Sequence, residues 1–301
     1  MKKKRMTEKQ SKDFANLIKN KIFQQSKTDR ATIFLCGGDL NNPIFFRNKV
    51  KKILETHPKL EILYPEELFD ELLYGQGQHS LLSLENILAN SVDVIIIIPE
   101  SPGSFAELGA FVNNEKLRKK MICLQDDKFK LKKSFINYGP IKLLRSENSL
   151  SVLRGDLSKL ESLDTGRTFY NRMIRSINKI RSNDPVIQSV DNILYAKRFI
   201  LPCIYLIDGI NNIFLYKLFR EATDKEDILC KMIVKSVLAG LIKESIIRST
   251  VEGYHITEIG MQYVLDNFNR RALDELRLEM MNFENRSKTT LHYDIMTNAH
   301  P

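Results

Sequence analysis

A carboxylate near the start of a predicted helix is the strongest candidate for chemistry in this sequence. Glu107 follows an aliphatic run and a Pro/Gly loop in the stretch D-V-I-I-I-I-P-E-S-P-G-S-F-A-E-L-G-A-F at 93–111. The positive end of the helix dipole favours the ionised form of a carboxyl group there. An ionised carboxylate at the mouth of a crevice can attack an anomeric carbon or stabilise an oxocarbenium-like centre. The alternative is that Glu107 only stabilises the start of its helix.

Glycine, polar and aromatic residues in the predicted loops could bind the substrate of such a reaction. The candidates are Gly37, Gly38, Asp39, Tyr64, Gln78, His79, Ser101, Gly103 and Ser104. Glycine lets a backbone approach a ligand closely, and serine hydroxyls can hydrogen-bond ribose or phosphate oxygens. His79 could protonate a leaving base, because histidine changes charge near neutral pH. The alternatives are a local turn bond for Asp39, core packing for Tyr64 and a solvent-facing loop position for His79.

The elements that must position these residues alternate between strands and helices. Strands are predicted at 31–36, 60–64, 92–98 and 121–124, and helices at 7–25, 45–56, 81–89 and 105–119. This alternation predicts an α/β fold with a doubly wound parallel sheet of the Rossmann-like kind. Because such sheets bind ligands beyond the carboxyl ends of their strands, the loops after the predicted strands should surround one crevice.

The second half of the chain is predicted to be mainly helical. A helix over 227–239 continues into an apolar segment, then a short hairpin with Gly253 near its turn and a helix from Thr257 to Phe268. Helix, hairpin and helix in this order resemble a winged helix-turn-helix. Phosphate contacts there are expected from Lys231, Lys235 and Lys243. One more amphipathic helix is expected over 271–285, as core or as an oligomer interface.

These patterns divide the 301 residues into five segments. We expect an N-terminal helix at 1–30, a catalytic α/β domain at 31–150, a basic helical connector at 151–185, a winged-helix domain at 186–285 and a C-terminal tail at 286–301. The formal charge of +9 favours a polyanionic partner. Four cysteines without a CxxC pair, and no signal peptide or membrane-length apolar run, favour a cytoplasmic protein without membrane association.

The residues around Glu107 resemble the nucleoside 2-deoxyribosyltransferase family. The resemblance lies in I-F-L-C-G-G at 33–38, an acid eight residues before Asp93, and S-P-G-S-F-A-E-L-G at 101–109. In that family the Glu of the E-L-G element is the nucleophile, which matches Glu107. An upstream acid that protonates or orients the base matches Glu85 by spacing, although the family usually has Asp. The family's acid on the loop before the nucleophile helix has no direct match.

A second resemblance covers nearly the whole chain. The elements Y-P-E-E-L-F-D at 64–70, G-Q-G-Q-H-S-L-L-S-L-E-N-I-L-A at 75–89, S-F-I-N-Y-G-P at 134–140, N-I-L-Y-A at 192–196 and L-P-C-I-Y-L at 201–206 resemble the effector protein of type II-A retrons. This resemblance implies an anti-phage toxin that a reverse transcriptase and its branched RNA–DNA product (msDNA) hold inactive. It also implies cleavage of the N-glycosidic bond of NAD or a related nucleotide. Water would be the final acceptor, and the sequence has no acidic or His/Cys cluster suited to a metal, so we expect no metal or cofactor.

Two other functions fit the same residues. The crevice could sense a nucleotide without cleaving it while the winged helix regulates DNA. Alternatively, the same site could remove bases from DNA or from deoxynucleotides. Product analysis and a Glu107→Gln variant separate these functions from NAD cleavage.

Overall fold

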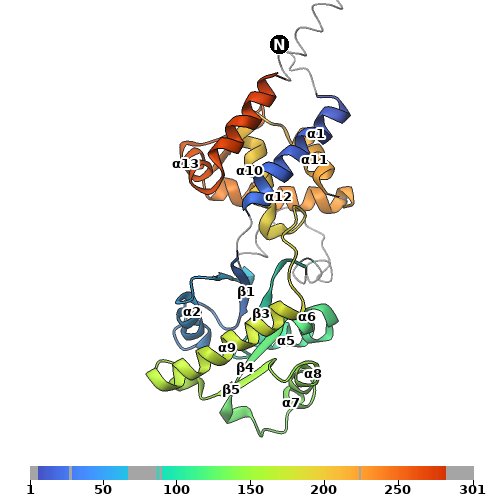
Figure 1. The fold of residues 1–301 in the computed structure, drawn as a ribbon. Helices are drawn as coiled ribbons and strands as arrows, with labels where there is room; N and C mark the ends of the chain where they lie inside the picture. Colours follow the sequence, from blue (N-terminus) through green and yellow to red (C-terminus); the bar gives the residue numbers. More distant parts are fainter. Residues whose placement is uncertain (1–5, 27–28, 67–86, 88–89, 224, 283–301) are drawn as a thin grey trace, which may run out of the picture. The chain divides into compact units, whose positions relative to one another are not determined.

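Two compact units make up the structure, which is a computed structural model that describes residues 6–26, 29–66, 87, 90–223 and 225–282 (Figure 1). An α/β unit runs from β1 to α9. A helical unit combines the N-terminal helices with α10 to α13. The predicted helix at 81–89 and the candidates Gln78, His79 and Glu85 lie outside the described residues.

The sheet of the α/β unit has five parallel strands in the order β2-β1-β3-β4-β5. Their bounds are β1 (Ala31–Cys36), β2 (Leu60–Leu63), β3 (Val94–Ile97), β4 (Met121–Asp126) and β5 (Val152–Gly155). The prediction of a doubly wound parallel sheet is confirmed, although β5 was not predicted. Strand β2 lies on one side of β1 and strands β3 to β5 lie on the other. The strand order therefore switches direction between the neighbouring strands β1 and β3. Ligands bind beyond the carboxyl ends of the strands at such a point.

Helices α2 (Phe46–Glu55) and α9 (Leu163–Asn183) cover one face of the sheet (Figure 1). Alternate residues of β1 and β3 point toward them, which is the two-residue period of a strand. This side of the core includes Ile33, Ile96, Leu54 and Met173, all fully buried. Helix α8 (Pro140–Glu147) packs against β4 and β5, and α5 (Pro102–Asn113) packs against α8.

The structure has two helices, α5 and α6, where the sequence predicted one helix over 105–119. Helix α5 begins at Pro102, three residues before the predicted start, and the helical segment is interrupted at Asn114. The Asn114 side chain accepts hydrogen bonds from the backbone N–H groups of Lys116 and Leu117, at 3.1 and 3.2 Å, and so starts the short helix α6 (Glu115–Lys119). Asparagine is a preferred helix-capping residue because its side chain satisfies such N–H groups.

The structure also divides the chain differently from the predicted segments. Residues 151–185 were expected to form a connector, but they supply β5 and α9 to the α/β unit. The reason is the apolar stripe of α9, where Phe169, Met173, Ile177 and Ile180 are buried against the sheet. A helix with such a stripe is stable only when the stripe is covered.

The helical unit contains α1 (Glu8–Ile18), η1 (Lys19–Phe23), α10 (Ile193–Leu206), α11 (Asn212–Ala222), α12 (Asp227–Lys243) and α13 (Glu258–Asn267). Helix α1 packs on α11, so the predicted N-terminal helix belongs to this unit. An antiparallel hairpin of β6 (Ile247–Ser249) and β7 (Tyr254–Ile256) lies between α12 and α13, as predicted. Gly253 precedes β7 with φ +148°, a conformation that favours glycine.

Residues 270–282 are helical, and their apolar stripe of Leu273, Leu276 and Met280 is buried within this chain. The described part of the predicted amphipathic helix is therefore core, and Phe283 lies outside the described residues. Among the helices that the structure describes, none is both long enough and apolar enough to cross a membrane.

A buried hydroxyl joins the first halves of β1 and β3, and its removal tests the packing of the sheet. Thr32 Oγ1 donates to Asp93 Oδ2 at 3.0 Å and accepts from the Asp93 backbone N–H at 2.9 Å. We expect Thr32→Val to lower the free energy of unfolding by about 1–3 kcal/mol, because buried polar groups lose their partners. Urea unfolding measures this loss. The matched change at exposed Thr56 should cost less than about 0.5 kcal/mol, and equal losses would contradict the analysis.

Candidate active site at the carboxyl ends of β1 and β3

The helix that carries Glu107 starts in a fully capped turn. Ser101 Oγ accepts from the Ser104 backbone N–H at 3.2 Å, and Ser104 Oγ accepts from the Ser101 backbone N–H at 2.9 Å. Pro102 occupies the first helical position, where its fixed φ suits a helix and its missing N–H needs no partner. This start fixes the rotation of α5 and places Glu107 in its second turn, beside the end of β1.

The Glu107 carboxyl is half-buried, and its pKa is raised to about 7. Burial is the largest cause, and the negative charge of Glu66 adds to it. The positive charge of Arg47 and a hydrogen bond from the Cys36 thiol act in the opposite direction. The sequence predicted that the helix dipole would favour the ionised form, but desolvation outweighs the effects that favour it. At pH 7 roughly half of the carboxyl groups are therefore ionised.

Arg47 is the cation of the site, and only 1% of it is exposed. Its guanidinium donates to both Glu66 carboxylate oxygens, at 2.7 and 2.8 Å, and to the Gly38 carbonyl at 3.0 Å. The guanidinium also lies over the Tyr64 ring, 5.3 Å from its centroid. Burial lowers the Arg47 pKa, but the hydrogen bonds and charge of Glu66 reverse this effect, so the pKa is raised. Arg47 is therefore a permanent positive charge at the switch point of the sheet.

Glu100 ties the end of β3 to the loop that leads into α2. Its carboxylate accepts three backbone N–H groups, from Gly38 at 3.1 Å, Phe46 at 2.6 Å and Arg47 at 3.0 Å. One carboxylate therefore holds the turn after β1 and the first turn of α2 in fixed positions. The start of α2 offers unpaired N–H groups and a positive dipole end, which suit such an anion.

The turn after β1 requires glycine because a larger residue there would clash with neighbouring side chains of the protein. A Cβ at Gly38 would overlap the Phe45 ring, and a Cβ at Gly37 would lie 2.9 Å from Arg47 Cβ. At Gly103, by contrast, a Cβ would meet no described atom within 4 Å. Close approach of a ligand at Gly103 stays a prediction.

The other predicted substrate-binding residues are already engaged within the protein. Asp39 is exposed, and its carboxylate accepts the Asn41 backbone N–H at 2.9 Å, which is the local turn bond named as the alternative. Tyr64 is 8% exposed and belongs to the core, the alternative for that residue. Ser104 is 1% exposed, and its hydroxyl belongs to the helix cap. Direct substrate contacts from these residues, and from the half-buried Ser101, stay predictions.

The lysines predicted to bind nucleic acid lie on α12, a helix whose apolar residues form much of the core of its unit. Lys231 forms an ion pair with Asp227 on the same helix at 2.5 Å. Lys235 is partly buried, and Lys243 is exposed at the helix end. Contacts of these three lysines with nucleic acid stay a prediction.

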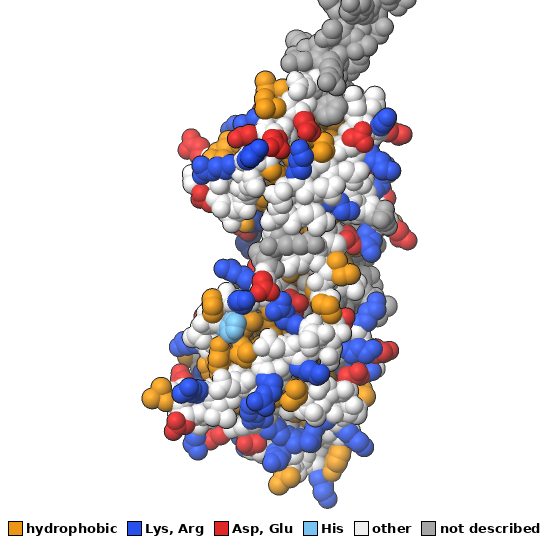
Figure 2. Space-filling model, in the orientation of Figure 1, with side chains coloured by type: hydrophobic (Ala, Val, Ile, Leu, Met, Phe, Trp, Pro, Cys, Tyr) orange, Lys and Arg blue, Asp and Glu red, His pale blue; other side chains and the backbone are white. Residues whose placement is uncertain are grey.

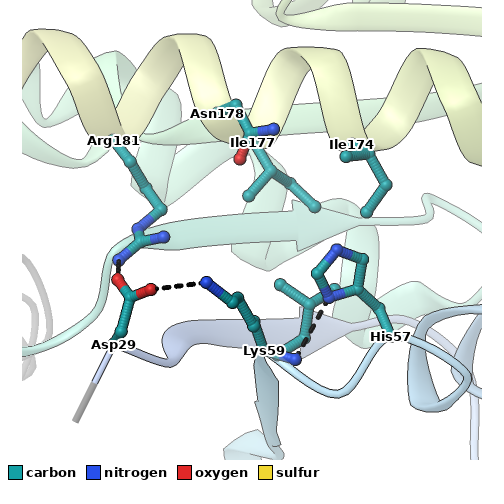
Figure 3. A pocket seen from close by; sticks show the side chains of 8 residues that line it. Asp29, His57, Lys59, Ile174, Ile177, Asn178 and Arg181 are labelled. Carbon is teal, nitrogen blue, oxygen red and sulfur yellow. Dashed lines mark hydrogen bonds and ion pairs between the residues drawn. The ribbon is translucent and has the colours of Figure 1, made fainter.

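A hollow of about 270 Å³ lies at the opposite end of the strands from Glu107, between the starts of β1 and β2 and the end of α9 (Figure 3). Its charged groups are paired: Asp29 contacts Lys59 Nζ at 2.8 Å and Arg181 Nη2 at 3.9 Å. The Lys59 backbone N–H also donates to His57 Nδ1. The candidate site is therefore the group of residues around Glu107 and Arg47 at the carboxyl ends of the strands, where doubly wound sheets bind ligands.

Sequence reasoning missed Arg47, Glu66 and Cys36 as members of the site. Arg47 lies in a helix that reads as an ordinary basic amphipathic segment, and its partner is 19 residues away in sequence. One available signal was position along the chain. Cys36 ends the predicted strand at 31–36, and Glu66 lies two residues after the predicted strand at 60–64.

We expect Glu66→Gln and Arg47→Met to move the Glu107 pKa in opposite directions. Loss of Glu66 removes a negative charge and leaves the Arg47 charge without its counter-ion, so the Glu107 pKa should fall below about 7. Loss of Arg47 removes the nearby cation, so the pKa should rise further. Titration of carboxyl carbons by NMR in full-length protein labelled on Glu measures both shifts, and the Glu107→Gln spectrum assigns the signal.

The control is Glu115→Gln, which removes an exposed glutamate of α6 that pairs with Lys119 of the same helix. It should leave the Glu107 titration unchanged. Arg47→Lys, which keeps the charge, serves as the second variant if Arg47→Met does not fold, and it should shift the pKa less. Shifts in the same direction for Glu66→Gln and Arg47→Met would contradict the assigned electrostatics.

Comparison with known proteins identifies the family of the chain. The family model of the STM3845 retron effector protein matches residues 43–249. The chain is 50% identical over 305 residues to an Escherichia coli protein named "Retron Ec86 putative ribosyltransferase/DNA-binding protein", with 99% of both chains covered. It is 39% identical over 124 residues to the corresponding Escherichia coli protein of retron Ec73, covering 40% of this chain and 39% of the relative. The chain therefore belongs to the STM3845 family of retron effector proteins.

Proposed function

We propose that this retron effector cleaves the N-glycosidic bond of NAD or a related nucleotide, with Glu107 as the nucleophile. The observation that carries the proposal is a half-buried carboxyl with a pKa of about 7 at the switch point of a parallel sheet. Carboxyl groups with perturbed pKa values in such crevices are candidates for catalysis. The ribosyltransferase in the names of both relatives refers to the same class of bond.

The charge of the substrate would complete the ionisation of Glu107. The glycosidic nitrogen of NAD belongs to a pyridinium ring, which carries a positive charge. A cation placed within about 4–6 Å of a carboxyl favours its ionised form. Substrate binding would therefore lower the Glu107 pKa and generate the nucleophile at neutral pH, while the free site keeps much of the carboxyl protonated.

The reaction proceeds in two displacements at C1′ of the ribose. A Glu107 oxygen forms a bond to C1′ as the C1′–N bond breaks, and the electron pair of that bond passes to the ring nitrogen. Nicotinamide leaves as a neutral molecule, so this step needs no general acid. Water then attacks C1′, the ester bond to Glu107 breaks and one proton passes to solvent. The products are ADP-ribose, nicotinamide and a proton.

Arg47 and Glu100 would position Glu107 and the glycine turn rather than react. Arg47 supplies a positive charge that partly offsets the burial of Glu107, and Glu66 limits how much of that charge acts on the carboxyl. Glu100 fixes the backbone on which Arg47 and Gly38 lie. Together, Arg47, Glu66 and Glu100 would hold Glu107 in position for attack while its carboxyl stays only partly ionised in the absence of substrate.

Regulation by the retron partners is part of the same proposal. The chain belongs to a retron effector family, so we propose that the reverse transcriptase and msDNA hold the enzyme inactive until infection. Homo-oligomer formation stays an open expectation from the sequence.

A metabolite assay in cells tests the activity. Wild-type chain expressed without its retron partners should lower NAD and release nicotinamide, and Glu107→Gln should reduce the rate by at least about a thousandfold, because an amide is a very poor nucleophile. Mass spectrometry of cell extracts measures both metabolites. Glu115→Gln is the matched control and should behave like the wild type.

Each other outcome contradicts one part of the proposal. Loss of deoxynucleotides or release of DNA bases, with unchanged NAD, would show that the substrate is a deoxynucleotide or DNA rather than NAD. If Glu107→Gln is as toxic as the wild type, catalysis at Glu107 does not cause the toxicity, and the DNA-regulating alternative is favoured. NAD loss that persists when the reverse transcriptase and msDNA are co-expressed would contradict the proposed inhibition.

A further inference from the structure

A strongly basic surface with exposed aromatic rings lies between β4 and α8 of the α/β unit. Residues 127–145 hold six cations and one acid. We define the basic–aromatic face by its exposed members, which are Lys128, Phe129, Lys130, Lys132, Lys133, Phe135, Tyr138, Lys142 and Arg145. Figure 2 shows Lys and Arg side chains with hydrophobic side chains among them on the lower part of the α/β unit, where α7 (Phe135–Tyr138) and α8 lie.

A network of hydrogen bonds holds this face in one arrangement. Asn137 Nδ2 donates to the carbonyl groups of Phe129 and Lys132, at 2.8 and 2.7 Å, so it closes the loop after β4 against α7. Asn137 Oδ1 accepts from Gln125, whose amide oxygen in turn accepts from Arg154 Nε at 2.8 Å. The loop is therefore tied to β4 and β5, and its side chains are presented by a fixed backbone.

One ring of the face lies close to two ammonium groups. Phe129 lies between Lys128 and Lys132, whose Nζ atoms are 4.9 and 4.8 Å from its centroid. Lys128 also lies 5.6 Å from the Phe46 ring, at the start of α2. Phe135 and Tyr138 are 83% and 64% exposed, so large apolar rings face solvent beside these cations. Exposed apolar side chains that gather in one patch, as they do here, can mark an interaction site.

A hollow of about 420 Å³ adjoins α7 and is lined by cations without an acid. Lys142, Arg145 and Arg154 line it, together with Asn137, Ile141 and Ser146. Burial lowers the Arg154 pKa, and the positive charge of Arg145 lowers it further. Among the residues that the structure describes, Lys142 and Arg145 form no ion pair, and the charge of Asp127 offsets only part of the repulsion between the Arg145 and Arg154 guanidinium groups. An anion in the hollow would relieve it.

We propose that the basic–aromatic face binds single-stranded nucleic acid, with a phosphate in the hollow at Arg145 and Arg154 and unpaired bases stacked on Phe135 and Tyr138. Cationic grooves with aromatic rings are the common means of binding single strands without sequence preference, because every base has a π face. A duplex would offer the phosphates but not the base faces. The rival partner is an anionic membrane surface, but α7, which carries Phe135 and Tyr138, has only four residues and is too short to lie in a membrane surface as an amphipathic helix.

This inference is independent of the proposed glycosidase activity and is tested without it. Full-length protein carrying Glu107→Gln is titrated against a fluorescent 20-nucleotide oligo(dT), a duplex of equal length and vesicles of one-third anionic lipid. The charge variant is Lys142→Glu/Arg145→Glu, and the stacking variant is Phe135→Ala/Tyr138→Ala. The matched charge control is Lys9→Glu/Lys12→Glu, which changes two exposed lysines of α1. Circular dichroism confirms that each variant is folded.

The proposal predicts tighter binding of the single strand than of the duplex. The charge variant should lose at least tenfold in affinity, and its log–log salt slope should fall by about 1.4, the share of two phosphates. The stacking variant should lose at least fivefold for each ring that contacts a base, with an unchanged salt slope. Equal losses in the α1 control, an unchanged stacking variant, or binding to vesicles without binding to oligo(dT) would each overturn the proposal.

Discussion

The buried guanidinium of Arg47 is the interaction on which the candidate site depends. It joins the turn after β1, the start of α2 and the residue Glu66 that follows β2, through three hydrogen bonds of 2.7 to 3.0 Å. A buried arginine is tolerated only when it is paired, and its bidentate carboxylate partner meets that need. The same charge acts on Glu107, so one ion pair both joins these segments and moderates the ionisation of Glu107, whose pKa is raised mainly by burial.

The elements around this ion pair were largely predictable from local patterns. The apolar run of β1 and the glycine turn that ends it gave the strand bounds as observed, and the Pro/Gly loop indicated where Glu107 enters its helix. Those features depend on residues close in sequence. Strand β5 was missed because it has four residues, of which only Val152 and Leu153 are buried. The bond between Arg47 and Glu66, and the three N–H groups that Glu100 accepts, join segments that only the fold brings together.

Residues 116–181 form one strongly basic stretch in the sequence, but the structure separates two kinds of charge within it. Arg172 donates to the carbonyl of Arg154, and Arg118 pairs with Glu147, so several basic residues of this stretch stabilise the α/β unit itself. The cations of the loop after β4 and of α8 face solvent beside aromatic rings instead. Composition alone could not distinguish these roles, because the difference lies in burial and partners rather than in residue type.

Trapping of a covalent intermediate tests most directly whether Glu107 is the nucleophile. A 2′-fluoro analogue of NAD slows both displacements by destabilising the oxocarbenium-like centre, so the glycosyl-enzyme should accumulate. Intact-protein mass spectrometry should show the mass of the analogue without nicotinamide, and peptide mapping should place it on Glu107. Release of nicotinamide with the adduct on another residue would contradict the account. So would release with no adduct under conditions where the analogue is turned over slowly.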